Sequence, residues 1–208
     1  MELVRVIAEV RSRGEDKKFI LSFPSSTNFF NNELDFSVPR RLCGEHMPEL
    51  KPTTPGETSR LQEIAAGTAV FYPHEIETLG AVLEDYHSTG AEYGHVARTL
   101  WMDGTAIGFL YAAPVEMTDR TWELWWIAVA KERQGEGWGG YLLQAAEEVV
   151  RQQAGRLMLI ETSSLPAYSG TRGFYEKYGY RWVAQLPDYY REGDDKVVFS
   201  KKFTPNVC

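Results

Sequence analysis

This sequence of 208 residues contains little cysteine and no long apolar run. The two cysteines, Cys43 and Cys208, are far apart, whereas disulfide-stabilised secreted domains are normally cysteine-rich. The densest apolar segment, 124–130, has the length of a strand, far short of the roughly 20 residues that span a bilayer. The first residues lack the charged and then apolar pattern of a signal peptide. We therefore expect a reduced, cytoplasmic protein without a membrane segment.

Positive charge is also in deficit, because 22 Lys and Arg residues face 29 Asp and Glu residues, a formal net charge of −7. Nucleic-acid binding requires a basic face, so we expect no nucleic-acid partner. An acidic protein instead attracts cationic molecules such as amines. Metal ligands are equally sparse: Cys43 and His46 have C-x-x-H spacing, but no second ligand pair accompanies them. We expect no bound metal.

The chain divides into an irregular extension of unknown role, 1–50, and a regular domain, 51–208. In the domain, apolar periodicity predicts helices at 58–66, 74–87, 137–154 and 171–178. Runs of β-branched and aromatic residues predict strands at 95–101, 105–112, 121–130, 156–161, 180–186 and 196–203. The first two strands are joined by Asp103-Gly104, a hairpin turn, and we expect Gly155 to be the left-handed residue that ends the long helix.

A glycine-rich turn, Gln134–Gly140, lies between the third predicted strand and the long helix. It has four glycines in six residues, more than a tight turn requires. Glycine lets a backbone approach a ligand closely, and the first turn of a helix offers unpaired N–H groups and the positive end of the helix dipole. The combination predicts a phosphate-binding turn.

Two phosphate ligands fit this turn. Gly135, Gly137 and Gly140 satisfy G-x-G-x-x-G, and Glu161 follows about 20 residues later, as in a dinucleotide-binding fold. Against that hypothesis, the segment from Ala130 separates the turn from its strand, and the chain after Glu161 is too short to complete a doubly wound sheet. An NAD(P)-dependent oxidoreductase is therefore the less favoured alternative.

The same turn fits [Gln/Arg]-x-x-Gly-x-[Gly/Ala] better, through Gln134, Gly137 and Gly139. On this motif the chain resembles the GNAT N-acetyltransferase superfamily. The run Trp122–Val129 is similar to the central strand of that family, and Gly173–Tyr180 is similar to its second signature, an aromatic-Tyr helix that ends in Gly-aromatic. The resemblance covers about residues 51–203. It implies an α+β fold, with a mixed, mostly antiparallel sheet, a splayed central strand pair and helices on both faces.

The resemblance also implies the ligand and the reaction. Acetyl-CoA is the expected co-substrate, and its acetyl group is transferred by direct attack of a primary amine. The acceptor is either a small amine or an amino group of a peptide or protein, and a homodimer is a possible assembly. A non-catalytic acyl-CoA-binding module of the same fold stays an alternative. The expected cofactor-binding residues are Ile127 and Val129 of the central strand and Gln134, Gly135, Glu136, Gly137, Trp138, Gly139 and Gly140 of the turn.

Two residues are predicted to be catalytic. Glu123 matches the family's general base, and strand alternation places it on the same face as Ile127, four residues later. The tryptophans around it are expected to raise its pKa, although a water relay and a solvent-facing carboxylate are open alternatives. Tyr175 aligns with the family's proton donor to the coenzyme sulfur, with a core tyrosine as its alternative. Tyr168 stands where many relatives have a cofactor-contacting asparagine, and Tyr189 is a candidate at the acceptor side.

Overall fold

One mixed β-sheet organises the part of the chain that the computed structural model describes, residues 48–203. Its strand order is β1-β2-β3-β4-β5-β7-β6. All neighbouring strands are antiparallel except β4 and β5, which are parallel. The strands are β1 (Glu49–Pro52), β2 (Val96–Met102), β3 (Thr105–Pro114), β4 (Thr121–Val129), β5 (Leu157–Ser163), β6 (Arg181–Arg191) and β7 (Asp194–Lys202).

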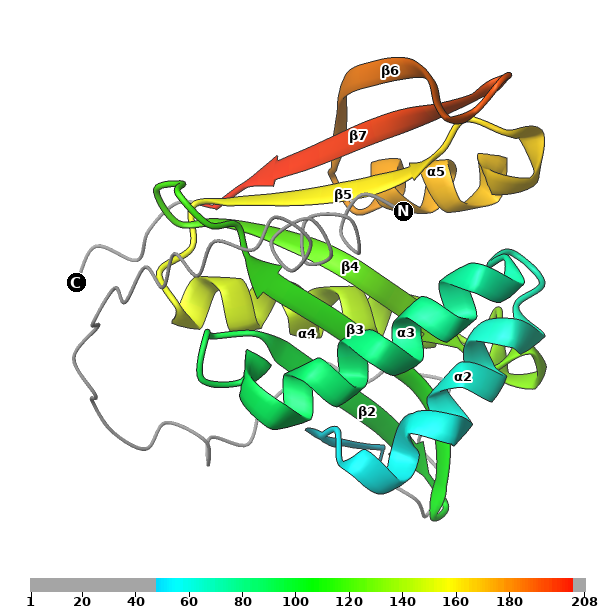
Figure 1. Cartoon of the computed structure of the whole chain (residues 1–208), viewed down its shortest axis with the longest axis vertical. Helices are drawn as coiled ribbons and strands as arrows, with labels where there is room; N and C mark the ends of the chain where they lie inside the picture. Colours follow the sequence, from blue (N-terminus) through cyan, green and yellow to red (C-terminus); the bar gives the residue numbers. More distant parts are fainter. Residues whose placement is uncertain (1–47, 204–208) are drawn as a thin grey trace, which may run out of the picture. The chain divides into compact units, whose positions relative to one another are not determined.

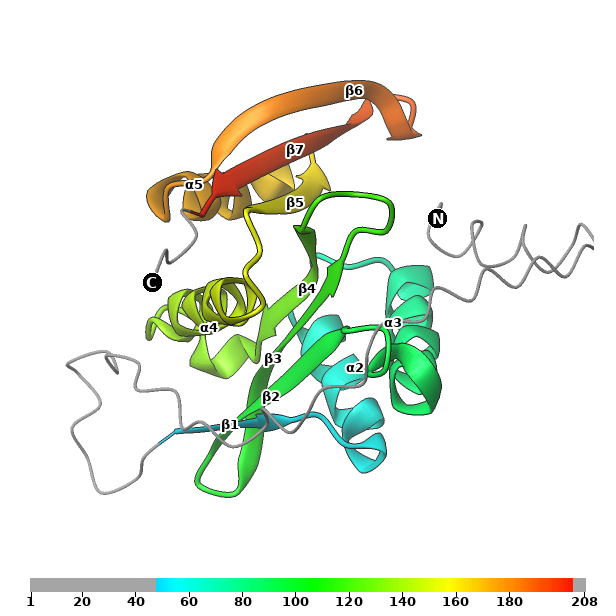
Figure 2. The same cartoon turned by 90° about the vertical axis from the view of Figure 1, so that its left-hand side faces the viewer.

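Helices cover both faces of this sheet (Figure 2). They are α2 (Thr58–Gly67), α3 (Pro73–Asp85), α4 (Trp138–Gln152) and α5 (Ser169–Lys177). Helices α2 and α3 pack on one face around Leu61, Leu79 and Leu83. Helices α4 and α5 pack on the other, where the core includes Leu142 and Tyr175. This arrangement confirms the predicted α+β fold, and the mostly antiparallel sheet shows that the doubly wound alternative is wrong.

Local sequence signals explain most of these elements. Asp103 and Gly104 both have positive φ, 51° and 73°, as a two-residue hairpin turn between twisted strands requires. The predicted role of Gly155 is wrong, because Ala154 is the left-handed residue, with φ 53°. Gly155 serves close packing instead, since a Cβ there would lie 2.5 Å from Val150 and 2.8 Å from Trp122. The first strand begins at Glu49, within the segment predicted as an extension, and residues 1–47 and 204–208 lie outside the described residues.

The sheet is split between its two parallel strands. Only Thr121–Leu124 of β4 pair with Leu157–Ile160 of β5. Beyond these pairs the strands diverge, and β5 continues against β7 as far as Ser163 (Figure 1). The predicted splay of the central strand pair is therefore present.

A candidate active site at the split between β4 and β5

The end of β4 presents backbone groups that no neighbouring strand uses. The N–H of Ala130 donates to the carbonyl of Ile107 in β3 at 2.8 Å. Because backbone groups of successive strand residues point to opposite edges, those of Ile127 and Val129 point away from β3, toward the split. No pairing with β5 is formed there. Both residues predicted to contact the cofactor through their backbone thus lie on an open strand edge.

The turn after β4 is built to leave amides free. Gly135 and Gly137 have φ values of 80° and 100°, which residues with a Cβ rarely adopt. The first bond inside α4 runs from the N–H of Tyr141 to the carbonyl of Gly137, at 3.1 Å. The N–H groups of the three preceding residues, Trp138, Gly139 and Gly140, therefore have no acceptor within the helix. These N–H groups form the positive end of the helix dipole, which favours binding of an anion.

Three side chains of the predicted cofactor set hold the turn in place. Gln134 Nε2 donates to the carbonyl of Val129 at 3.1 Å, which ties the turn to β4. Trp138 is buried in the core on the α4 side, and its Nε1 donates to Glu136 at 2.9 Å. Glu136 also pairs with Arg133 at 3.2 Å. These side chains position the backbone, which leaves the amides themselves as candidate ligand groups.

The last two glycines of the turn make room for α5. A Cβ on Gly139 would touch the ring of Phe174 at 3.6 Å. A Cβ on Gly140 would overlap the hydroxyl of Tyr178 at 1.8 Å. The hydroxyl of Tyr178 thus lies against the first turn of α4, a placement that the sequence analysis did not predict. Tyr178 belongs to the Gly173–Tyr180 motif and directly follows α5 in the structure.

A β-bulge changes the predicted face of Glu123. Tyr111 of β3 pairs with Trp126, but Ala112 pairs with Leu124, so Trp125 is an extra residue in β4. Alternation is therefore interrupted between Glu123 and Ile127. Ile127 packs against the core on the α4 side, with Leu124, while Trp125 and Trp126 pack on the α2–α3 side. Glu123 alternates with Leu124 and faces α2 and α3, so the prediction that it shares a face with Ile127 is wrong.

Glu123 is half-buried, and its neighbours change the pKa of its carboxyl. Burial, and secondarily the charge of Glu161, raise the pKa of Glu123 from its ordinary 4.5 to about 7. A hydrogen bond from Trp125 Nε1 to Glu123 Oε2, at 3.2 Å, and the charge of Lys196 act in the opposite direction on this pKa. The net result is a carboxyl that is about half ionised near neutral pH, as a general base requires.

The bulge residue, Trp125, packs against the rings of Tyr111 and His95. The rings of Trp125 and Tyr111 are stacked, with centroids 5.3 Å apart and planes 20° apart. The hydroxyl of the buried Tyr111 lies 2.7 Å from Nδ1 of His95, whose ring also meets the edge of Trp125. The sequence analysis did not assign Tyr111 or His95 to the site, because only the bulge and the pairing of β3 with β4 bring them next to Trp125.

An ion pair from β5 and β7 borders Glu123. Lys196 Nζ lies 2.7 Å from Glu161 Oε2 and 3.7 Å from the ring centroid of Tyr189. Tyr189, a predicted acceptor-side candidate, therefore lies next to Lys196 and close to Glu161. Burial, and secondarily the charges of Glu161 and Tyr189, raise the pKa of the neighbouring Tyr190. Lys196 was missed, since nothing local in the sequence links it to Glu161, 35 positions earlier in the chain.

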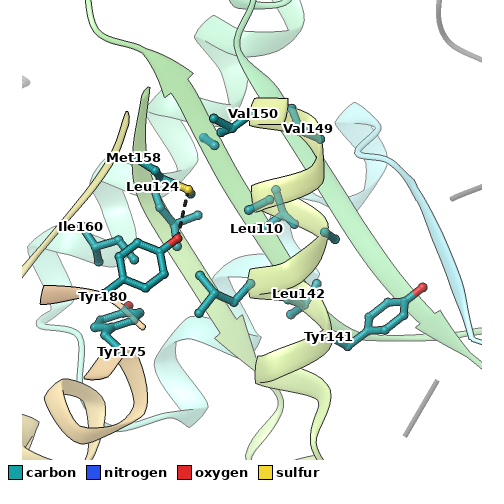
Figure 3. Packing of buried hydrophobic residues seen from close by; sticks show 14 of the residues in the cluster. Leu110, Leu124, Tyr141, Leu142, Val149, Val150, Met158, Ile160, Tyr175 and Tyr180 are labelled. Atoms are coloured by element: carbon teal, nitrogen blue, oxygen red, sulfur yellow. Dashed lines mark hydrogen bonds between the residues drawn. The ribbon is translucent and has the colours of Figure 1, made fainter. Parts of the chain in front are cut away.

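Tyr175 lies in the core on the α4 side, next to Tyr180 and Ile160 (Figure 3). Its ring centroid is 5.9 Å from that of Phe199 and 6.1 Å from that of Tyr180. Burial raises the pKa of its phenol, which therefore stays protonated at any working pH. The role of Tyr175 as proton donor stays a prediction, and this surrounding also suits its alternative as a core tyrosine.

The described part of the chain contains no group of three or more His, Cys, Asp or Glu side chains that could hold a metal ion. Within residues 48–203, no helix is long and apolar enough to cross a membrane.

Comparisons with known proteins point to one family. The family model "Acetyltransferase (GNAT) family" matches residues 59–180. A solved structure from Desulfovibrio desulfuricans, assigned to the GNAT acetyltransferases, is 30% identical, with a TM-score of 0.72 over 75% of this chain and 99% of that one. No match was found among curated protein sequences.

More distant structures share the fold and include coenzyme complexes. YncA of Salmonella typhimurium, assigned as an acetyltransferase and solved with acetyl-CoA, is 17% identical with a TM-score of 0.61, over 77% of this chain and 99% of that one. The PaiA N-acetyltransferase of Thermoplasma acidophilum, solved with coenzyme A, is 18% identical with a TM-score of 0.59, over 76% and 99%.

Proposed function

The chain belongs to the GNAT acetyltransferase family, and on that premise we propose that it transfers the acetyl group of acetyl-CoA to a primary amine. The observation that carries this proposal is the split edge of β4. The backbone groups of Ile127 and the N–H of Val129 face the split without a strand partner, and the free amides of α4 come after the glycine-rich turn. An extended ligand with amides along its length and a diphosphate at one end fits such a sequence of groups.

The residues present suit acetyl-CoA. Backbone groups of Ile127 and Val129 would bond the amide-bearing arm, as an added strand bonds to a sheet edge. The amides of the turn and of Trp138, Gly139 and Gly140 would bind the diphosphate. The space at Gly135 supports this assignment, since a Cβ there would meet nothing within 4 Å. The side chains of Gln134 and Glu136 would act indirectly, by fixing the turn.

The chemistry divides between positioning and proton transfer. Acetyl-CoA supplies an activated thioester carbonyl. Glu123, with its pKa of about 7, would take a proton from the acceptor nitrogen, directly or through one water. The nitrogen forms its bond to the carbonyl carbon, and the carbon–sulfur bond breaks, with its electron pair leaving on sulfur. The phenol of Tyr175 is the proposed hydrogen-bond donor to that thiolate, and holding the reactants together supplies the rest of the acceleration.

Two measurements test the proposal. Calorimetric titration should show binding of acetyl-CoA, with NADH as the negative control ligand. A thiol-release assay over a panel of primary amines should show turnover, and Glu123→Gln should reduce kcat/KM by roughly 10²–10⁴-fold, the usual contribution of a general base. Failure to bind acetyl-CoA would refute the proposal. Tight binding without turnover of any amine would instead favour the non-catalytic acyl-CoA-binding module.

A further inference from the structure

The indole of Trp125 is hydrogen-bonded to the carboxyl of Glu123. The two residues are two positions apart in β4 and lie on its α2–α3 side, where Trp125 Nε1 donates to Glu123 Oε2 at 3.2 Å. Within residues 48–203, no hydrogen bond is formed to the other oxygen, Oε1. The two oxygens of this carboxyl therefore differ, because one is bonded within the protein and the other is available to a reactant.

A buried aromatic ring holds the indole of Trp125 in one orientation. The rings of Trp125 and Tyr111 stack, with centroids 5.3 Å apart and planes 20° apart. Tyr111, in β3, is only 1% exposed, and the ring of Tyr86 packs against it with centroids 5.8 Å apart. Turning the indole would break the stack and uncover a buried ring, which costs free energy. Packing thus sets the direction of the indole N–H independently of Glu123.

His95 completes this aromatic set from the segment before β2. Its Nδ1 lies 2.7 Å from the hydroxyl of Tyr111, and its ring lies at 75° to that of Trp125, with centroids 5.5 Å apart. Burial raises the pKa of Tyr111, so the phenol keeps its proton. Burial also lowers the pKa of His95 below its ordinary 6.5, although the charges of Asp85 and Glu116 oppose this shift. At neutral pH the hydroxyl therefore donates to an uncharged imidazole.

The charged neighbours of Glu123 do not orient its carboxyl. Glu161 in β5 raises the pKa of Glu123 and Lys196 in β7 lowers it. These two groups pair with each other, Lys196 Nζ to Glu161 Oε2 at 2.7 Å, and Lys196 also lies 3.7 Å from the ring centroid of Tyr189. Among the described residues, neither forms a hydrogen bond or ion pair with Glu123. Within this part of the chain, the indole N–H is therefore the group that fixes the direction of the carboxyl.

We propose that Trp125 is a positioning residue, whose indole N–H holds Oε2 of Glu123 so that Oε1 takes the proton from the acceptor amine. This inference rests on the proposed function, because Trp125 acts through the base proposed there. A hydrogen bond to a carboxylate favours its charged form, so the same contact keeps the buried base ionisable near neutral pH. Without it, the carboxyl would rotate and would hold its proton more tightly.

An NMR signal of the unmodified protein tests the contact without acceptor or coenzyme. With isotope-labelled nitrogen in the tryptophan indoles, the Nε1–H signal of Trp125 is identified by its loss in Trp125→Phe. This signal should titrate with a midpoint near pH 7, the pKa of Glu123. In Glu123→Gln the same signal should not titrate in this range. A Trp125 signal that does not respond to pH in the unmodified protein would overturn the proposal.

The substitution Trp125→Phe separates positioning from packing. Phenylalanine keeps an aromatic ring against Tyr111 and removes the N–H donor. Carbon NMR of the Glu123 carboxyl should show a pKa about 1 unit higher, the usual size for a hydrogen bond to a charged group. Looser packing would instead admit water and lower this pKa toward its ordinary 4.5. A fall in the pKa, or no change, would overturn the proposal.

Trp126→Phe is the matched control. Trp126 is the next residue of β4, and it packs on the same side against the ring of Phe71, with centroids 5.0 Å apart. Among the described residues it forms no hydrogen bond with Glu123. This variant should leave the pKa of Glu123 within about 0.3 units of the native value. A rise equal to that of Trp125→Phe would overturn the role of the Trp125 N–H.

Kinetics connect the contact to the proposed reaction. With an amine that the native chain acetylates, and at a pH where Glu123 is ionised in both proteins, Trp125→Phe should lower kcat about tenfold. The KM for acetyl-CoA should change by less than about 2-fold, because the proposed coenzyme-binding groups belong to other residues. A raised KM with unchanged kcat would overturn the proposal. Absence of acetyl-CoA binding would refute the proposed function, while the NMR titrations would still report whether Trp125 holds the carboxyl.

Discussion

Replacing Glu123 by glutamine is expected to stabilise the folded protein at alkaline pH while it removes activity. The pKa of Glu123 in the folded protein is about 7, against an ordinary value of 4.5. Between those two pH values the folded state holds a proton that the unfolded state has already released. The free energy of unfolding therefore falls as pH rises through this window, and the loss is complete above about pH 7.

The size of the effect follows from the raised pKa. The span from 4.5 to about 7, at about 1.4 kcal/mol for each pH unit, corresponds to roughly 3 kcal/mol in full. Between about pH 5 and about pH 8 the free energy of unfolding of the native chain should fall by roughly 2 kcal/mol. Glutamine has nearly the shape of the protonated carboxyl and no charge to desolvate, so Glu123→Gln should not suffer this loss.

Urea denaturation of both proteins at about pH 5 and about pH 8 measures the difference directly. Relative to the native chain, Glu123→Gln should gain roughly 2 kcal/mol between the two pH values, which is about 4–8 °C in Tm for a domain of this size. Thiol release by the variant should stay low at both. A stability difference that is the same at both pH values would refute the raised pKa and, with it, the environment proposed for the base.

Three other substitutions test separate parts of the site. Lys196→Met should move the midpoint of the kcat/KM profile to higher pH, because Lys196 lowers the pKa of Glu123; an unchanged midpoint would contradict this. Gly140→Ala should cost about 1–3 kcal/mol in urea denaturation, because its Cβ would lie 1.8 Å from the Tyr178 hydroxyl; Tyr178→Phe in the same chain should restore part of the loss. Gly137→Ala should cost about 1–2 kcal/mol, because φ is 100° there; native-like stability would show that the turn relaxes.

Local patterns in the sequence were enough to predict the main elements and the family. The periodicity of α3 and α4, the Asp103-Gly104 turn and the glycines at 134–140 each depend on neighbours in the chain. The free amides at the start of α4 follow from that turn. For these features a single sequence holds the relevant information, because capping, turn conformation and amphipathic spacing are short-range properties.

The bulge at Trp125 could not be predicted from the same sequence. The run Trp122–Val129 is apolar at nearly every position, so it carries no alternation from which a shift of face would be visible. Residue-by-residue pairing with β3 is needed to show that the strand has one residue too many. The error about the face of Glu123 has this single origin.

Contacts between residues that are far apart in the chain also could not be predicted from the sequence. Lys196 and Glu161 meet because β5 and β7 pair in one particular register, and the hydroxyl of Tyr168 donates to the carbonyl of Val70, 98 positions earlier in the chain. Charged and hydroxyl side chains separated by that many positions in the sequence leave no periodic pattern from which their contact could be predicted. The setting of Tyr175 among Tyr180 and Phe199 likewise depends on how α5 packs against β7.

The short pairing between β4 and β5 also has a consequence for how the protein opens. Four ladder positions join two sheet portions, each of which is internally paired over longer stretches. Such a seam marks a boundary between cooperative units, so amide hydrogens of β6 and β7 should exchange through a different opening event from those of β2 and β3. A ligand that bonds to the exposed edge of β4 would act as a missing strand at this boundary and slow both kinds of exchange together.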